Sequence, residues 1–548
     1  MQFSDQSDDL ENSADLVLLN GSVWTVNDVQ PWAEAVAVKE GKILEVGTTT
    51  EIKNIVKGKE RVVDLKGAFV IPGFIDSHTH FLDGGFVLSG IQLRDVKTRE
   101  EFVSKIAEKA EEIEEGEWIC NGDWNHQLFK MPELPRKEWI DNVTRKNPVC
   151  INRLDHHMVL VNSVALRIAG ISKNTPSPSG GEIVKDTLSG EPTGILKDSA
   201  MDIVRSHIPE PPLKEKMKSA RLALKHANES GVTSIHEMAT AANFEVYQEL
   251  FKQDNLTARL YVFIPISEVD LYAHWKLKAS FGNNFLKIGG LKGFVDGSLG
   301  SSTALFFKPY EDNPKNTGLL SSDMLPEGTI KKRLMKADEA GLQVAVHAIG
   351  DRANHIIIGL FEDIVDKNVV RDRRWRIEHA QHLLDEDIER MGKLNVIASV
   401  QPYHAIDDGC WVEKKLGTKR ASKSYAYKSL FDKGVITVFG SDWTVAPLNP
   451  LTGIYAAVTR RTLDGKYPEG WIPEQKTSIM EAIKAYTLNG AYAEFSENVK
   501  GSIEKGKFAD LVVLDRNLFE IPAEDMLRTQ VLMTVFNGKI VYESRFIG

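Results

Sequence analysis

Residues 72–80 read PGFIDSHTH and follow the apolar run AFVI at residues 68–71. His78 and His80 are separated by a single residue. On an extended backbone, the side chains of residues i and i+2 point to the same side of the strand. Two imidazoles placed in this way can converge on one metal ion. A buried strand that ends in this pair therefore predicts a metal site at the end of that strand.

Seven more apolar runs follow, and helical patterns lie between several of them. The runs are VTSIHE (232–237), RLYVFIPI (259–266), GLKGFVD (290–296), LQVAVHA (342–348), WRIEHA (375–380), VIASVQ (396–401) and VITVFGSD (435–442). Continuous apolar runs are typical of strands buried on both faces of a parallel sheet. Together with the first run (69–76), they predict a (β/α)8 TIM barrel, whose active site lies at the carboxyl ends of its strands.

The two ends of the chain have a different pattern from the middle. Residues 15–69 and the segments FADLVVLD (508–515) and VLMTVFNGKIVYE (531–543) read as short strands joined by turns. We expect 1–69 and 500–548 to form one small β-sandwich domain, and 70–81 with 226–499 to form the barrel. Residues 82–225 are too many for a simple βα connection. We expect them to form an α+β insertion domain over the active site.

Composition excludes several classes of protein. The 548 residues include 67 Lys and Arg against 77 Asp and Glu, which gives a net charge of −10, and 42% are hydrophobic. These values exclude a disordered chain, and the acidic balance argues against binding to nucleic acid or anionic membranes. Cys120, Cys150 and Cys410 form no CxxC pair, which argues against a disulfide framework and a thiolate zinc site.

The sequence also predicts a compartment. The first 15 residues, MQFSDQSDDLENSAD, lack the apolar core of a signal peptide. The chain has no run of about 18 apolar residues, the length that a membrane-spanning helix needs. We therefore expect a cytoplasmic protein.

Further chemistry-bearing residues fall at the ends of predicted strands. His347, His379 and Asp442 each stand at or just after the end of an apolar run. Imidazole and carboxylate ligands together suit zinc and other divalent metals. Lys292 lies inside the run GGLKGFVDG, where a buried ammonium is costly unless it is paired, neutralised or modified. Carboxylation of Lys292, pairing with Asp296, and a side chain that reaches past a helix to solvent are all compatible with the residues alone.

These residues resemble the amidohydrolase superfamily of metal-dependent hydrolases. The resemblance matches its metal ligands to His78, His80, Lys292, His347, His379 and Asp442. More narrowly, the chain looks like the amidohydrolase 3 branch, which includes N-substituted formamide deformylases. The matching segments are LDHHMVLVNSVAL (154–166), GEPTGIL (190–196), DGSLGSSTALF (296–306), HAIGDRA (347–353), EHAQH (378–382) and GSDWTVAPLNP (440–450). The branch usually has Asp-Gly-His where this chain has Asp155-His156-His157.

The resemblance implies an enzyme that hydrolyses a non-peptide C–N bond, in an amide, formamide or related compound, by metal-activated hydroxide. It implies two divalent ions per chain, expected to be Zn²⁺, bridged by carboxylated Lys292, with Asp442 carrying the proton. A mononuclear deaminase of the same fold is an alternative, and a non-catalytic scaffold is another. All six ligand positions are filled here, which argues against the scaffold.

The substrate is expected to be a small molecule, and the protein is expected to form a homodimer. The candidate substrate contacts stand in the insertion or near predicted strand ends. They are Trp124, His156, His157, His236 and Trp443. For His236 a hydrogen-bonded scaffold role is an equally good interpretation, and for the aromatic residues a place in the core is the commoner one.

Overall fold

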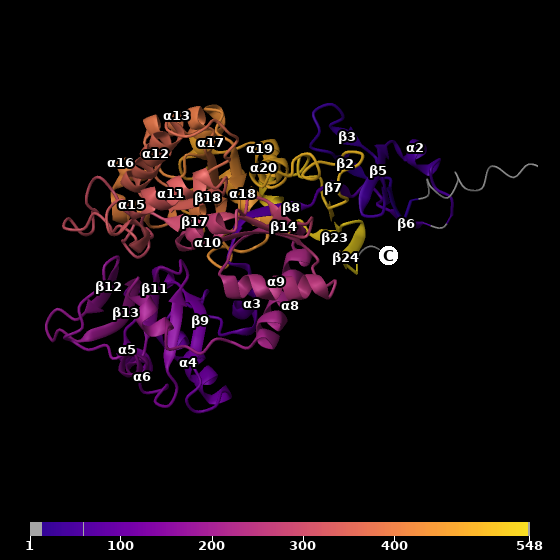
Figure 1. Cartoon of the computed structure of the whole chain (residues 1–548). Coiled ribbons are helices and arrows are strands. Elements are labelled where there is room, and N and C mark those ends of the chain that lie inside the picture. Colours follow the sequence, from indigo (N-terminus) through magenta and orange to yellow (C-terminus); the bar gives the residue numbers. More distant parts are fainter. Residues whose placement is uncertain (1–13, 59, 546–548) are drawn as a thin grey trace, which may run out of the picture.

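The computed structural model describes residues 14–58 and 60–545 (Figure 1). Most of the N-terminal stretch used for the signal-peptide prediction, residues 1–13, lies outside the described residues. Within the described ranges, none of the helices combines the length and apolar character that a membrane crossing requires.

Eight parallel strands form the centre of the molecule. In sheet order they are β21 (Thr437–Phe439), β20 (Ile397–Val400), β19 (Arg376–His379), β18 (Gln343–Ala348), β17 (Leu286–Phe294), β15 (Arg259–Pro265), β14 (Val232–Met238) and β8 (Phe74–Thr79). The first and last strands meet just beyond their ends, where the Asp442 amide donates to His78 O at 2.7 Å and the His80 amide donates to Trp443 O at 2.7 Å. The predicted TIM barrel is confirmed, and its strands lie at the predicted apolar runs.

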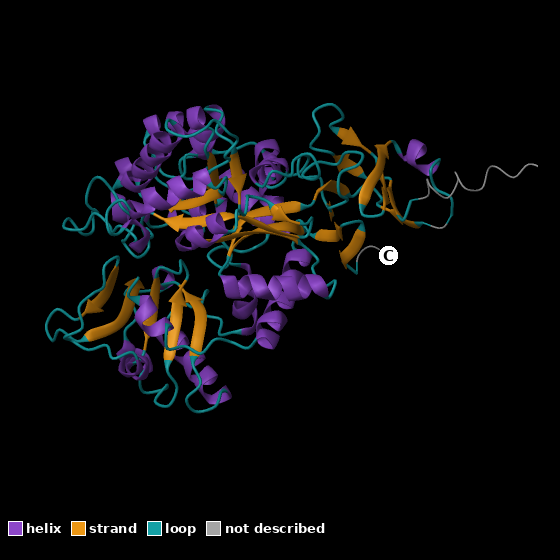
Figure 2. Ribbon diagram, viewed as in Figure 1, coloured by secondary structure: helices purple, strands orange, loops and turns teal. Residues whose placement is uncertain are grey.

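Helices surround these strands (Figure 2). The main ones are α8 (Leu213–Glu229), α9 (Ala241–Lys252), α11 (Thr329–Glu339), α12 (Asp351–Val365), α13 (Asp385–Leu394), α14 (Pro402–Asp408), α17 (Tyr427–Asp432), α18 (Pro450–Thr459), α19 (Ile479–Ala485) and α20 (Leu488–Ala493). α11 buries Ile330, Leu334 and Ala337, whose spacing places them on one face of the helix. Gly341 follows this helix with φ +73°, a left-handed conformation that glycine adopts without steric cost.

Strands from both chain ends form two sheets at the amino-terminal end of the barrel (Figure 1, indigo and yellow). One has the order β5 (Lys42–Gly47), β4 (Ala35–Lys39), β1 (Leu16–Leu19) and β6 (Arg61–Asp64). The other has the order β24 (Lys539–Glu543), β23 (Val531–Phe536), β22 (Leu511–Leu514), β7 (Phe69–Pro72), β2 (Ser22–Trp24) and β3 (Trp32–Ala33). Side chains such as Leu18, Val36, Val70 and Leu511 share one apolar core between the sheets.

The boundary expected at residue 69 differs from the structure. β7 pairs with β2 and β22 in the terminal sheet, so this sheet continues to Pro72 and the barrel begins at Phe74. The apolar run 69–76 therefore contributes to two sheets. The Asp510 carbonyl accepts from the Gly73 amide at 2.8 Å at the point where the chain leaves one sheet for the other.

The region between β8 and β14 contains a separate five-stranded sheet (Figure 1, purple). Its order is β12 (Gly181–Lys185), β13 (Pro192–Asp198), β11 (Met158–Val161), β10 (Val149–Arg153) and β9 (Ile119–Trp124). Helices α4 (Arg99–Glu112), α5 (Lys137–Ile140), α6 (Ser163–Ile168) and α7 (Met201–Arg205) accompany it. The expected boundary at 225 falls inside α8, a continuous helix that packs against α3 (Phe81–Ser89) and α9.

Candidate metal centre

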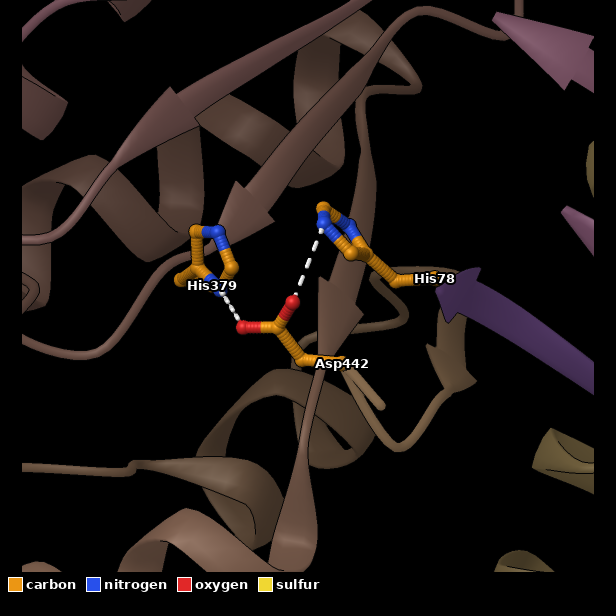
Figure 3. Close-up of side chains that lie close together, drawn as sticks. All are labelled: His78, His379 and Asp442. Carbon is orange, nitrogen blue, oxygen red and sulfur yellow. Dashed lines mark ion pairs between the residues drawn. The ribbon is translucent and has the colours of Figure 1, made fainter. Parts of the chain in front are cut away.

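Three predicted ligands converge at the carboxyl ends of the barrel strands (Figure 3). One ligand atom each of His78, His379 and Asp442 lies within 4.8 Å of the others, and all three residues are buried. Asp442 Oδ1 is 3.6 Å from His78 Nε2, and Asp442 Oδ2 is 3.8 Å from His379 Nδ1. His80 joins the group, because its Nε2 lies 3.4 Å from Asp442 Oδ1.

Neighbouring acceptors determine which nitrogen of each imidazole is free. Glu378 accepts from His78 Nδ1, which leaves Nε2 facing the centre. Gln401 Oε1 lies 2.8 Å from His379 Nδ1, while Gln401 Nε2 donates to Ser399 O. This amide orientation makes His379 Nδ1 the proton-bearing nitrogen. Hydrogen bonds of this kind orient histidine ligands in metal sites.

His347 belongs to the same group of rings. Its centroid lies 4.6 Å from that of His379, which in turn is 4.9 Å from that of His78. Gly297 O accepts from His347 Nε2 at 3.1 Å, so Nδ1 is the nitrogen available to a ligand. Asp296 lies beside the same nitrogen at 3.5 Å and accepts hydrogen bonds from the Ile349 and Gly350 amides. His347 is thus held by two adjacent residues of the loop after β17, and amides of the loop after β18 hold Asp296 in place.

Lys292 lies inside the barrel beside these histidines. Its residue exposure is 5%, and its Nζ is 3.4 Å from His78 Nε2. Across residues 14–58 and 60–545, no carboxylate lies within ion-pair distance of this amine. Burial lowers the pKa of Lys292 to about 8. The structure therefore does not pair Lys292 with Asp296, which was one of the alternatives.

The arrangement fits a divalent metal. Burial raises the pKa of Asp442, but the nearby His78, His80 and His379 outweigh it and hold the pKa well below its usual range. Asp442 Oδ1 is buried without a hydrogen-bond partner. An ionised carboxylate without a donor, surrounded by imidazole nitrogens, is a donor set that zinc and similar ions bind.

A cavity of about 1400 Å³ extends from this centre toward the insertion. Of the predicted substrate contacts, His156 and His157 line it. His157 Nδ1 lies 2.6 Å from Asp198 Oδ1, and its ring is 5.1 Å from that of His347. His156 stacks on His80 with centroids 5.7 Å apart, and its Nε2 is 2.7 Å from Thr444 Oγ1. Both histidines of the insertion therefore contact or approach rings of predicted metal ligands.

The structure places the other three candidates elsewhere. The His236 ring is fully buried in the barrel, where Arg376 donates to its Nδ1 at 2.7 Å and Glu494 lies 3.3 Å from its Nε2. Trp124 is fully buried in the core of the insertion and donates to Ile151 O at 3.0 Å. Trp443 packs against Phe81 of α3. All three side chains are buried in the protein interior, and none of them lines the cavity.

Sequence reasoning missed several residues that support the centre. Glu378 stands directly before His379 in EHAQH, yet it binds His78 of another strand. His404 of α14 lines the cavity, with Nε2 3.9 Å from Asp442 Oδ2. The histidine in QPYH was visible in the sequence just beyond a strand end, and the same reasoning used for His347 applied to it. Gln401 offered no such signal, because glutamine is common beside any strand.

Comparison with known proteins agrees with this geometry. Residues 61–542 match the family model described as Amidohydrolase family. Protein LONG AFTER FAR-RED 3 from Arabidopsis thaliana is 39% identical over 542 residues, covering 96% of this chain and 92% of that protein. N-substituted formamide deformylase from Arthrobacter pascens is 27% identical over 552 residues, covering 96% of this chain and 98% of that protein.

A solved structure extends the agreement to the fold. An uncharacterized metal-dependent hydrolase from Pyrococcus horikoshii OT3 superposes with a TM-score of 0.75 at 28% identity, covering 93% of this chain and 99% of that one. The barrel, the strand-end histidines and the family match lead to one conclusion. The chain belongs to the amidohydrolase family and is a metal-dependent hydrolase.

Proposed function

We propose that this enzyme hydrolyses a non-peptide C–N bond, in an amide, formamide or related small molecule, with two divalent ions, preferably Zn²⁺. His78, His80 and Asp442 would hold one ion, and His347 and His379 the other. Carboxylated Lys292 would bridge them. The observation that carries this proposal is the convergence of these buried side chains at one end of the barrel.

The chain's own groups supply the proton transfers. Bound divalent ions activate water as a nucleophile near neutral pH and polarise a carbonyl group. Asp442 is ionised and lies between three imidazoles, so its carboxylate can accept the proton of the attacking water. The same carboxyl group then donates this proton to the leaving nitrogen. Asp442 therefore acts as both ligand and proton carrier.

Lys292 supports the binuclear form of the site. A buried amine without a carboxylate partner is costly, and here it faces an imidazole nitrogen that is itself expected to bind metal. The neutral form of such an amine attacks the carbon of CO₂ and releases a proton to solvent, which forms a C–N bond and gives an anionic carbamate with two ligand oxygens in place of the cation. The modification would replace a buried, unpaired cation beside the histidines by an anion that can bind metal.

The cavity supports a small-molecule substrate selected by the insertion. Its volume of about 1400 Å³ exceeds what a formyl group needs, so the site has room for a bulky amine portion. His157 lines this space, and Asp198 orients its ring by a 2.6 Å hydrogen bond. The similarity to a formamide deformylase makes N-formyl and N-acyl amines the first compounds to test.

The test measures metal, modification and turnover together. Protein grown with zinc should contain about two ions per chain, and intact-mass analysis under native conditions should show one added CO₂ that is absent from Lys292→Ala. N-formyl and N-acyl amines should be hydrolysed by the loaded enzyme. A fully active protein that contains no metal would refute the mechanism, and an unmodified Lys292 in active enzyme would refute the carbamate.

A mononuclear aminohydrolase is the second candidate. The three-residue group of His78, His379 and Asp442 can hold a single ion without Lys292. Such an enzyme would release ammonia from a ring amidine. One zinc per chain, with ammonia release from aminated heterocycles and no cleavage of amides, would favour this function over the first. The expected homodimer stays a prediction, and sedimentation velocity of the full chain tests it.

A further inference from the structure

Apart from Lys292 at the metal centre, one cationic side chain that lines the cavity lacks an ion-pair partner among the described residues. Arg205, at the end of α7, lines the cavity and donates from Nη2 to Asn152 Oδ1 at 3.1 Å. In the part of the chain that the structure describes, no carboxylate lies within ion-pair distance of its guanidinium. A guanidinium has five N–H donors, and the described residues accept only this one hydrogen bond from Arg205.

Three other cations of the cavity wall, away from Lys292 at the metal centre, are paired. Arg153 Nη1 lies 2.7 Å from Asp155, Lys216 Nζ lies 2.6 Å from Glu210, and Lys109 Nζ lies 3.2 Å from Glu112. The contrast matters because a paired cation contributes little attraction to a ligand. The charge of Arg205 remains available to attract a ligand.

Two amide side chains that line the same cavity provide further donors. Asn152 of β10 accepts from Arg205, and its amino group donates to no other described residue. Asn121 of β9 also lines the cavity and makes no side-chain hydrogen bond with the described residues. Guanidinium and amide N–H groups that face one space form a donor set suited to a carboxylate or phosphate.

The position of Arg205 relates this donor set to the metal centre. Arg205 lines the same cavity as the predicted metal ligands His78 and His80. His156 also lines it, and its ring stacks on that of His80 with centroids 5.7 Å apart. A substrate held at the centre by its scissile bond can extend an arm past His156 toward Arg205.

We propose that Arg205, Asn152 and Asn121 form an anion-binding subsite for a carboxylate or phosphate on the part of the substrate remote from the scissile bond. This inference rests on the proposed function, since it names the class of amide that the same cavity would accept. The negative group would receive charge-assisted hydrogen bonds from Arg205 and neutral ones from the two amides.

The experiment compares substrates that differ in one terminal group. The metal-loaded enzyme is assayed with N-formyl-6-aminohexanoate, N-formyl-5-aminopentyl phosphate and neutral N-formylhexylamine. We expect kcat/KM to be about tenfold to a hundredfold higher for at least one anionic compound, the factor that a charge-assisted hydrogen bond supplies. The compound with the higher value distinguishes carboxylate from phosphate. Arg205→Ala should remove this preference through KM and leave the neutral compound unchanged, and Arg205→Lys should keep part of it.

Lys216→Ala is the matched control, because it removes a cavity cation that is already paired with Glu210. Binding is also measured directly by calorimetry in an Asp442→Asn background, where kcat is expected to fall by a factor of about 10² to 10⁴ or more. If none of the compounds is hydrolysed, the proposed function fails for formamides, while calorimetry still decides the subsite. Equal binding of charged and neutral compounds, an unchanged preference in Arg205→Ala, or an equal loss in Lys216→Ala would overturn the subsite.

Discussion

At the scale of single residues, the centre is defined as much by what holds each imidazole as by the imidazoles themselves. Glu378 bonds to His78 and also accepts from Arg376 Nε at 2.8 Å, so one carboxylate connects a predicted ligand to a fully buried guanidinium. Gln401 accepts a hydrogen bond from His379, and Gly297 O accepts one from His347. Each ring is thereby fixed in the tautomer that leaves one nitrogen for metal.

Asp442→Asn tests the proton carrier. The amide keeps the shape of the side chain but cannot accept a proton, so we expect kcat to fall by a factor of about 10² to 10⁴ or more. Metal should be partly retained, since four histidines remain. Steady-state kinetics and elemental analysis of the same preparation measure both effects. Near-normal turnover would remove Asp442 from the mechanism.

Glu378→Gln tests the orientation of His78. The glutamine amide is neutral and has one acceptor oxygen instead of two. We therefore expect the metal affinity of the site to fall by a factor of about 10 to 100. Competition with a chelator measures it. Glu362→Gln, at a carboxylate that pairs with Arg390 on the outer helices, is the control and should leave metal affinity unchanged. Equal affinities in the Glu378 variant and the wild type would contradict the assigned role.

At the scale of elements, several of the contacts between the insertion and the metal centre fall on a short segment of chain after β21. Arg94 of the insertion donates to the carbonyls of Thr444 and Val445, and His156 bonds to the Thr444 hydroxyl. Asp442, two residues before Thr444, is thereby connected to a different sheet. The position of the cavity wall and the position of this ligand are coupled by these contacts.

Arg94→Ala should loosen this connection. Two hydrogen bonds from a charged donor are lost, each contributing about 1.5–3 kcal/mol when formed by a charged group. We expect faster amide hydrogen exchange in residues 442–449 and a lower kcat/KM. Hydrogen-exchange mass spectrometry locates the change. Arg136→Ala, at a partly exposed pair with Asp186 in the insertion, is the control and should leave that exchange rate unaltered. Unchanged exchange in the Arg94 variant would show that the segment is held by other contacts.

At the scale of the whole molecule, both ends of the chain hold the amino-terminal side of the barrel. Arg259, the first residue of β15, makes a two-pronged ion pair with Asp510 at 2.6 and 3.0 Å. Both side chains are 5% exposed. Arg259 also donates to Asn284 O and Asn537 Oδ1, so a single guanidinium joins the barrel to the terminal sheet.

Asp510→Ala should destabilise this junction strongly. It leaves a buried guanidinium without its carboxylate, which costs about 3–5 kcal/mol. Glu543→Ala removes the partner of Arg61 in a pair whose side chains are 53% and 34% exposed, and should cost less than about 1 kcal/mol. Urea-induced unfolding of the three proteins compares these free energies. Equal losses in both variants would show that burial of the Asp510 pair adds nothing.

Much of this architecture was predictable because its signals are local. Eight apolar runs separated by helical patterns indicated the barrel, and chemistry-bearing residues at the ends of those runs indicated the metal centre. The split of the run 69–76 was not predicted, because apolar residues stand on both sides of Gly73, at Phe69–Pro72 and at Phe74 and Ile75. The sheet that each one joins depends on strands far along the chain, β22 in one case and β14 in the other.

The amino-acid sequence by itself determined which segments are strands and which residues carry the chemistry, since periodicity and residue type are properties of short segments. Only the tertiary structure decided where side chains point. In the folded protein, His236 and Trp124 are buried in the interior. His156, His157 and Arg205 of the insertion line the cavity. The tertiary structure also placed Glu378 against His78 across the barrel. These contacts join residues up to 300 positions apart, which no local pattern encodes.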